Sequence, residues 1–165
     1  MLKFVNYSVV FREVPNEVTL AINISGCPNK CKGCHSPHLM EDVGAVLDNE
    51  MLYSLLCRYN NAITCVCFMG GDAEPEKVEQ LAFFVRRATN GRIKTAWYSG
   101  KSQLPRGFII ESFNYIKLGP YIEKLGGLDS PFTNQRFYKI EEGRMVDKTC
   151  LFAKRKVVKT EASYQ

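Results

Sequence analysis

The sequence predicts an α/β domain built on a parallel sheet. Two short apolar runs, at 64–69 and 93–98, are each followed by a glycine-containing turn. Such uninterrupted runs are typical of strands that are buried on both faces. Segments with helical spacing of apolar residues lie before and after the first run. This order of strands and helices is typical of a parallel sheet with helices packed against it.

The first half of the chain is expected to form an extended segment, a strand, a helix and a second strand. Their expected bounds are 4–14, 18–24, 49–59 and 64–69. The extended segment and the first strand are rich in aromatic and β-branched residues, and Pro15 separates them. Asp48 or Asn49 can cap the first helix, and its leucines recur on one face. Between strand and helix lie a cysteine loop and a polar connection at 41–48.

The second half is expected to begin with a helix and to continue in strands. The expected helix is 75–89, and the strand-like runs are 93–98, 108–110, 115–118, 136–140 and 145–146. Glu74 and Glu76 favour the start of the helix, and Asn90-Gly91 ends it. Gly119-Pro120 stops the run at 115–118, and Glu142-Gly143 forms a turn between the last two runs.

Size and composition predict one globular domain over residues 1–165. The chain is 45% hydrophobic and 24% charged, which is ordinary for a folded domain. It is shorter than the about 250 residues of a complete eight-fold βα barrel. The net charge of +5 is spread along the chain and is weak support for nucleic-acid binding. We therefore expect no nucleic-acid partner.

The sequence shows no targeting signal and no membrane segment that would predict a location outside the cytoplasm. Its first residues lack the apolar core of a signal peptide, and no apolar run approaches the roughly 20 residues of a membrane span. The seven cysteines are odd in number and clustered, which favours metal binding over a disulfide framework. We expect a cytoplasmic protein with no membrane partner. Cys57, Cys150 and the strand pair Cys65 and Cys67 are interpreted as structural.

The feature richest in chemistry is the loop that carries Cys27, Cys31 and Cys34. Three thiolates at this spacing can hold zinc, Cu(I) or an iron–sulfur cluster. If they bind a [4Fe–4S] cluster, one iron lacks a protein ligand and stays open. A structural zinc site with His35 or His38 as fourth ligand is the alternative, and three unpaired thiols are the simplest reading.

Three segments are expected to meet beside one another. The cysteine loop, Gly70-Gly71-Asp72 and Tyr98-Ser99-Gly100 each follow a predicted strand. Ligand sites in parallel sheets lie at the carboxyl ends of the strands. A glycine pair also lets the backbone approach a ligand closely. The sequence therefore predicts one site at this edge of the sheet.

These motifs resemble the radical S-adenosylmethionine (SAM) family, and within it the activating enzymes of anaerobic (class III) ribonucleotide reductases. The matching segments are 13–17, 25–37, 69–72, 119–122 and 134–136. Asp72 replaces a glutamate found in many members, and Leu118 replaces an acid. The resemblance implies a partial, incomplete βα barrel of the radical SAM type with a parallel sheet core.

The resemblance also implies the chemistry. Cys27, Cys31 and Cys34 would bind a [4Fe–4S] cluster whose open iron takes the amino and carboxylate groups of SAM. One electron would split SAM to methionine and a 5′-deoxyadenosyl radical, which removes hydrogen from a glycine of the reductase. The large catalytic subunit of the reductase would be the protein substrate, and a low-potential donor such as flavodoxin would supply the electron.

The site residues follow from the same resemblance. Gly70, Gly71 and Asp72 would hold the methionyl amino group, while Tyr98 and Ser99 lie where they could contact the ribose. His35 is either beside the adenine or an ordinary loop histidine. No catalytic side chain is assigned, because the cofactor performs the bond cleavage.

Two other functions remain open at this stage. The same scaffold could act on a small molecule or activate another glycyl-radical enzyme. A zinc-binding interaction module without catalysis is the alternative from another class. The segment at 134–136 is interpreted either as part of the site or as a solvated turn, and the basic run at 154–159 as a solvated chain end.

Overall fold

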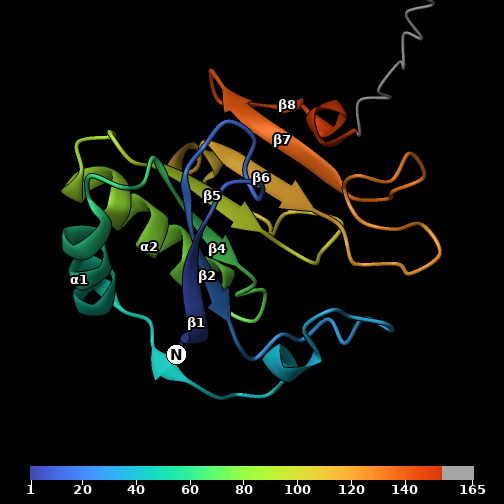
Figure 1. Cartoon of the computed structure of the whole chain (residues 1–165), viewed down its shortest axis with the longest axis horizontal. Helices are drawn as coiled ribbons and strands as arrows, with labels where there is room; N and C mark the ends of the chain where they lie inside the picture. Colours follow the sequence, from blue (N-terminus) through green and yellow to red (C-terminus); the bar gives the residue numbers. More distant parts are fainter. Residues whose placement is uncertain (154–165) are drawn as a thin grey trace, which may run out of the picture.

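The fold is centred on one sheet of eight strands, described for residues 1–153 in a computed structural model (Figure 1). The strands are β1 (Lys3–Val10), β2 (Thr19–Ile24), β3 (Ala45–Val46), β4 (Cys65–Met69), β5 (Lys94–Tyr98), β6 (Tyr115–Leu118), β7 (Arg136–Glu141) and β8 (Arg144–Asp147). The α-helices are α1 (Asn49–Tyr59) and α2 (Pro75–Ala88), and the 3-10 helices are η1 (Pro37–Met40), η2 (Ile110–Ser112) and η3 (Thr149–Phe152). Both predicted α-helices are thus confirmed, with the end of the second shifted by one residue.

The sheet is mixed, with parallel strands in the middle and antiparallel strands at both edges. Its order is β3-β1-β2-β4-β5-β6-β7-β8. The strands β2, β4, β5 and β6 run parallel to one another. The strands β1 and β3 on one side, and β7 and β8 on the other, pair antiparallel. The carboxyl ends of the four middle strands therefore lie at one edge of the sheet. The partial barrel of the radical SAM type stays a prediction.

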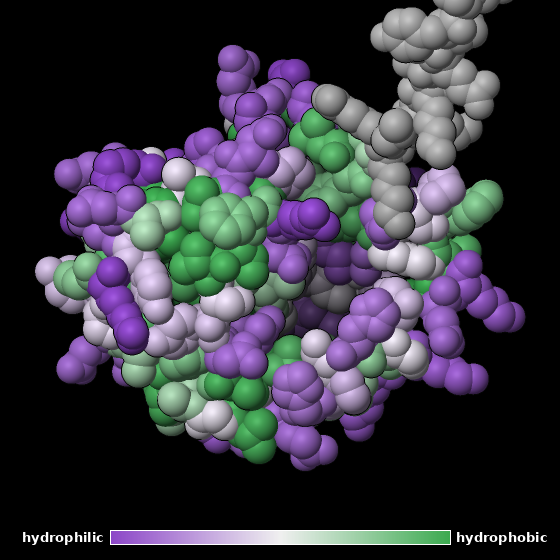
Figure 2. All heavy atoms as spheres, viewed as in Figure 1, coloured by the Kyte–Doolittle hydropathy of each residue, from purple (hydrophilic) through white to green (hydrophobic). Residues whose placement is uncertain are grey.

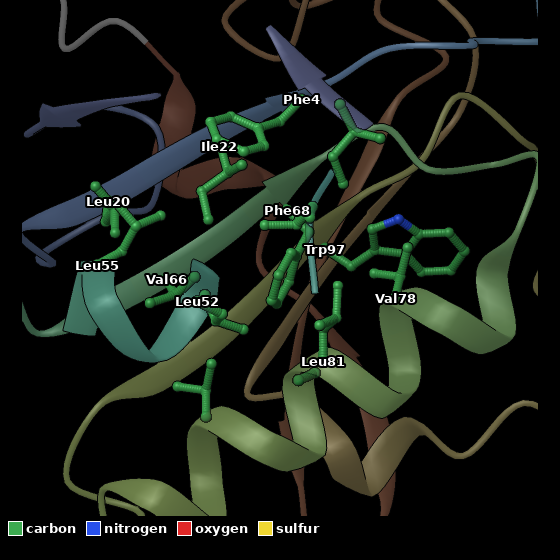
Figure 3. Packing of buried hydrophobic residues seen from close by; sticks show 14 of the residues in the cluster. Phe4, Leu20, Ile22, Leu52, Leu55, Val66, Phe68, Val78, Leu81 and Trp97 are labelled. Carbon is green, nitrogen blue, oxygen red and sulfur yellow. The ribbon is translucent and has the colours of Figure 1, made fainter. Parts of the chain in front are cut away.

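Both α-helices pack on the same face of the sheet (Figure 1). Asp48 caps α1 by accepting a hydrogen bond from the Met51 N–H at 2.9 Å, and Pro75 begins α2 at a position where its missing N–H is not needed. Figure 3 shows Leu52 of α1 near Phe68 of β4, and Val78 of α2 beside Trp97 of β5. The helices close this face against solvent and connect the parallel strands.

The opposite face of the sheet carries a second core. It is formed by Cys65 and Cys67 of β4 and by residues of the neighbouring strands, among them Tyr98 and Phe137. Side chains alternate along a strand, so Val66 and Phe68 face the helices while the two cysteines face the other way. Cys65 and Cys67 are fully buried, which confirms that they are core residues. Burial on both faces explains the uninterrupted apolar run of β4.

A buried carboxylate joins the amino ends of the parallel strands. Glu17 accepts hydrogen bonds from Thr64 at 2.6 Å, from Tyr115 at 2.8 Å and from the Lys94 ammonium. Burial alone would raise the pKa of Glu17, but these donors outweigh it and lower the pKa below its ordinary value. Burial and the same carboxylate raise the pKa of Tyr115. This cluster lies at the edge opposite to the predicted site.

Two expectations about local structure are wrong. The run at 108–110 is not a strand, because Phe108 packs its ring on Trp97 at a centroid distance of 4.8 Å and the chain then turns into η2. The connection at 41–48 includes the two-residue strand β3, which pairs with the beginning of β1.

Both α-helices are too short or too polar to cross a membrane, and no other helix of residues 1–153 could do so.

Candidate metal centre

A cavity of about 220 Å³ lies where β2, β4, β5 and β6 end. The cysteine loop, Gly70, Tyr98 and Gly119, which follow or end these four strands, all contribute to its wall. In the view of Figure 2 the surface is hollowed on the side where these strands end, beside the segments that follow them. The expected meeting of these segments at one edge of the sheet is therefore confirmed. Their role in holding a cofactor stays a prediction.

The cysteine loop curls because three of its residues have left-handed backbone conformations. These are Gly26, Lys30 and Gly33, with φ of 71°, 46° and 73°. Hydrogen bonds from Gly26 N to Glu41 O and from Cys27 N to Leu39 O, both of 2.9 Å, tie its start to the segment after it. Glycine adopts this conformation without steric cost, which explains two of the three positions.

The loop brings its three cysteines to one cavity. Cys27, Cys31 and Cys34 all line it and are all half-buried with free thiols. The Asn29 amide nitrogen lies 3.6 Å from the Cys27 sulfur, and the Ser36 backbone N–H donates to the Cys34 sulfur at 3.4 Å. Donors directed at sulfur stabilise negative charge there, as a metal-bound thiolate requires.

The donors that line the cavity are three thiols without a histidine. Among residues 1–153 no three His, Cys, Asp or Glu side chains are grouped so that they could hold one ion. In a [4Fe–4S] cluster the thiolates bind different irons, so their sulfurs surround the cluster and do not converge on one atom. His35 packs its ring on Tyr121 at 4.6 Å, and neither it nor His38 lines the cavity. The zinc site with a histidine ligand is therefore not formed by the described residues.

The glycine pair after β4 is required by the backbone and by packing. Gly70 and Gly71 have φ of 101° and 87°, in the left-handed region. Gly70 accepts a hydrogen bond from the Trp97 indole at 2.7 Å and donates one to the Tyr98 carbonyl at 2.9 Å. Gly70 lines the cavity, whereas Gly71 is buried and faces Val78 of α2. Only the first of the two glycines therefore lies at the cavity, and its N–H and carbonyl already hydrogen-bond within the protein.

Asp72 connects three segments of the cavity wall. Its carboxylate accepts hydrogen bonds from the Asn29 amide at 2.5 Å, from the Ser99 hydroxyl and from the Gly100 N–H at 2.9 Å. Asp72 itself lines the cavity, whereas Ser99 is fully buried and does not. Ser99 thus orients the Asp72 carboxylate without lining the cavity itself.

Tyr98 offers the cavity its ring and not its hydroxyl. The hydroxyl donates to the backbone carbonyl of Glu13, and the ring packs edge-on against Phe137 at 6.3 Å. Burial raises the pKa of Tyr98, and the nearby Glu13 carboxylate acts in the same direction. His35 is exposed and packs on Tyr121, a residue that does line the cavity.

Lys117 is a buried cation of the cavity wall that sequence reasoning missed. Its ammonium donates to the carbonyls of Gly119 at 2.9 Å and Ser99 at 3.3 Å. Burial lowers the pKa of Lys117 to about 8, although the negative charge of the Asp72 carboxylate opposes that shift. The signal was available, because a lysine stands inside the apolar run 115–118.

The segment 134–136 contributes one side chain to the cavity. Gln135 is buried, lines the cavity and donates to the Gly119 carbonyl at 3.4 Å. Asn134 donates to the Pro120 carbonyl at 3.0 Å, and Arg136 begins β7 with an exposed side chain. Of the two readings left open by the sequence, participation in the site holds for Gln135. The basic run at 154–159 lies outside the described residues.

Comparison with known proteins gives one match. The model of a family described as a 4Fe-4S single cluster domain matches residues 17–106, which is more than half of the 165 residues. The matched span includes all three loop cysteines, the glycine pair and the end of β5. Neither the curated proteins nor the solved structures that were compared match the chain.

Proposed function

Because the chain belongs to the 4Fe-4S single cluster domain family, we propose that it is an iron–sulfur activase of the radical SAM type. In this proposal Cys27, Cys31 and Cys34 bind the [4Fe–4S] cluster. The protein substrate of the activase is the large subunit of an anaerobic ribonucleotide reductase. One observation carries the proposal. The cavity that receives the three thiols is also lined by Gly70, Asp72 and Lys117, which supports binding of a second, polar ligand beside the cluster.

When bound, the cluster supplies one low-potential electron to SAM and one iron without a protein ligand. The chain's own residues bind and orient SAM. The cavity presents a carboxylate, Asp72, and an ammonium, Lys117. These opposite charges match the ammonium and carboxylate of the amino-acid end of SAM. Gly70 also lines the cavity, and a side chain at this position would press on the Ile24 carbonyl at 3.2 Å.

The cavity wall also limits water near the reacting atoms. Ile24, Leu39, Met40 and Met69 form apolar parts of this wall. A primary carbon radical reacts with whatever C–H bond is nearest, so a dry and ordered site is needed. The three cysteines are nevertheless only half-buried, so the cavity has an opening to the surface. This opening supports entry of a loop from another protein.

The choice of partner rests on the motifs in the second half of the chain. Gly119 and Gln135 belong to the segments that resemble the activating enzymes of class III reductases. Both residues line the cavity, together with Tyr121. A substrate loop that entered this cavity would meet segments shared with that family, which supports the reductase over a small molecule.

The test uses anaerobically purified protein, with iron and acid-labile sulfide measured first. The protein is then reduced, for which flavodoxin is the natural candidate, and mixed with SAM and the reductase. We expect a glycyl radical signal by electron paramagnetic resonance (EPR) that is absent when the acceptor glycine is replaced by alanine. Cleavage of SAM without this signal would replace the reductase by a small-molecule substrate. Stoichiometric zinc without iron would overturn the whole proposal.

A further inference from the structure

We propose that Asn29 is a positioning residue that sets the reduction potential of the cluster and ties the cysteine loop to Asp72. It stands between Cys27 and Cys31 in the loop, yet its side chain reaches both a ligand sulfur and the acid after β4. This inference rests on the cluster of the proposed function. It does not depend on SAM or on the reductase.

The Asn29 amide nitrogen is shared between two acceptors. It lies 3.6 Å from the Cys27 sulfur and 2.5 Å from an Asp72 carboxylate oxygen. A primary amide has two N–H groups, so one can be directed at each neighbour. A thiolate and a carboxylate both accept hydrogen bonds and donate none, so the amide must present its nitrogen to them and not its oxygen.

The chain leaves room for this contact at Gly100. A Cβ atom at that position would overlap the Asn29 amide nitrogen and would lie 3.1 Å from its carbon. Gly100 does not have a left-handed backbone, so the lack of a side chain matters here for space alone. The Gly100 N–H also donates to the same Asp72 oxygen at 2.9 Å. Asp72 and Gly100 together hold the Asn29 side chain against Cys27.

The consequence for a bound cluster follows from electrostatics. Hydrogen bonds to cluster sulfurs are one of the factors that set reduction potentials. Reduction adds negative charge, part of which resides on the thiolates. A donor at Cys27 therefore stabilises the reduced form more than the oxidised form and raises the potential. Without the Asn29 amide the cluster becomes harder to reduce.

The matched control is another asparagine of the same cavity. Asn23 also lines the cavity, but its amide donates to the Asn6 side chain and to no cysteine. Asn23→Ala thus removes an amide of the same size from the same wall while leaving the Cys27 contact intact. Gly100→Ala is the second probe, because it displaces the Asn29 amide and leaves every residue of the cysteine loop unchanged.

The experiment is an EPR-monitored redox titration of the anaerobic protein without SAM, with iron content matched between variants. We expect a lower midpoint potential in Asn29→Ala and Gly100→Ala, and no shift in Asn23→Ala. An unchanged potential in both of the first two variants would overturn the inference, as would an equal shift in Asn23→Ala. If Asn29→Ala loses its iron, Gly100→Ala decides alone. A wild-type cluster that never cleaves SAM would refute the activase and leave this inference standing.

Discussion

Replacing Gly71 by alanine tests whether packing, and not a ligand, requires the second glycine of the pair. Its φ of 87° costs a non-glycine residue about 1–2 kcal/mol. The new Cβ would also lie 2.5 Å from a methyl carbon of Val78, and overpacking of this kind costs about 1–3 kcal/mol. We therefore expect Gly71→Ala to lower the free energy of unfolding by about 2–5 kcal/mol.

The assay is denaturant unfolding of the anaerobic protein, compared with Gly91→Ala as control. Gly91 has a similar φ of 72°, but nothing lies within 4 Å of a Cβ built there. It should lose only the backbone part, about 1–2 kcal/mol. Val78→Ala should cost less in the Gly71→Ala protein than in the wild type, because it removes the clashing methyl group. Equal destabilisation by the two glycine substitutions would refute the packing argument.

Three further predictions concern the buried carboxylate, the cysteines and the acid of the cavity. Tyr115→Phe should lower the free energy of unfolding by about 1.5–3 kcal/mol, since the Glu17 carboxylate loses a donor. Because the pKa of Glu17 is lowered in the folded protein, its carboxylate stabilises the fold at pH values above the unfolded pKa of about 4.3. This stabilisation is lost as the pH falls through the native pKa. The free energy of unfolding, measured against pH, should therefore show the deficit of Tyr115→Phe vanishing over that range. Cys31→Ala should lose iron and sulfide in metal analysis, whereas Cys57→Ala should keep both. Asp72→Asn keeps the shape of the side chain, so the variant should stay folded by circular dichroism. Its affinity for SAM, measured by calorimetry, should fall about tenfold because a charged partner is lost. Unweakened binding would show that Asp72 does not belong to the SAM site.

The sequence was sufficient for elements whose signals are local. The helices α1 and α2 were predicted from a capping residue, from apolar spacing and from the turn at Asn90-Gly91. The meeting of the cysteine loop with Gly70 at one edge was also predictable, because parallel strands end together. Neither argument needs knowledge of contacts between distant residues.

The parts that could not be predicted depend on such distant contacts. Asn29 and Asp72 are 43 positions apart, and no local pattern shows that their side chains meet. Ser99 was expected to face a ligand, but its hydroxyl is turned to Asp72 inside the wall. The run at 108–110 has strand-like composition, but Phe108 stacks on Trp97 and Phe113, and the Ile109 N–H donates to Glu79 of α2 and not to a strand. The sequence pattern determines the local backbone conformation, whereas the direction of a side chain depends on the residues that the fold places next to it.

The central claim is that SAM binds beside a three-cysteine cluster in the cavity at the ends of β2, β4, β5 and β6. The most direct measurement is the EPR spectrum of the reduced, oxygen-free protein recorded before and after SAM is added. We predict that SAM changes the spectrum of the cluster, and that the change is lost on Asp72→Ala. A cluster spectrum that SAM leaves unaltered at saturating concentration would contradict the account.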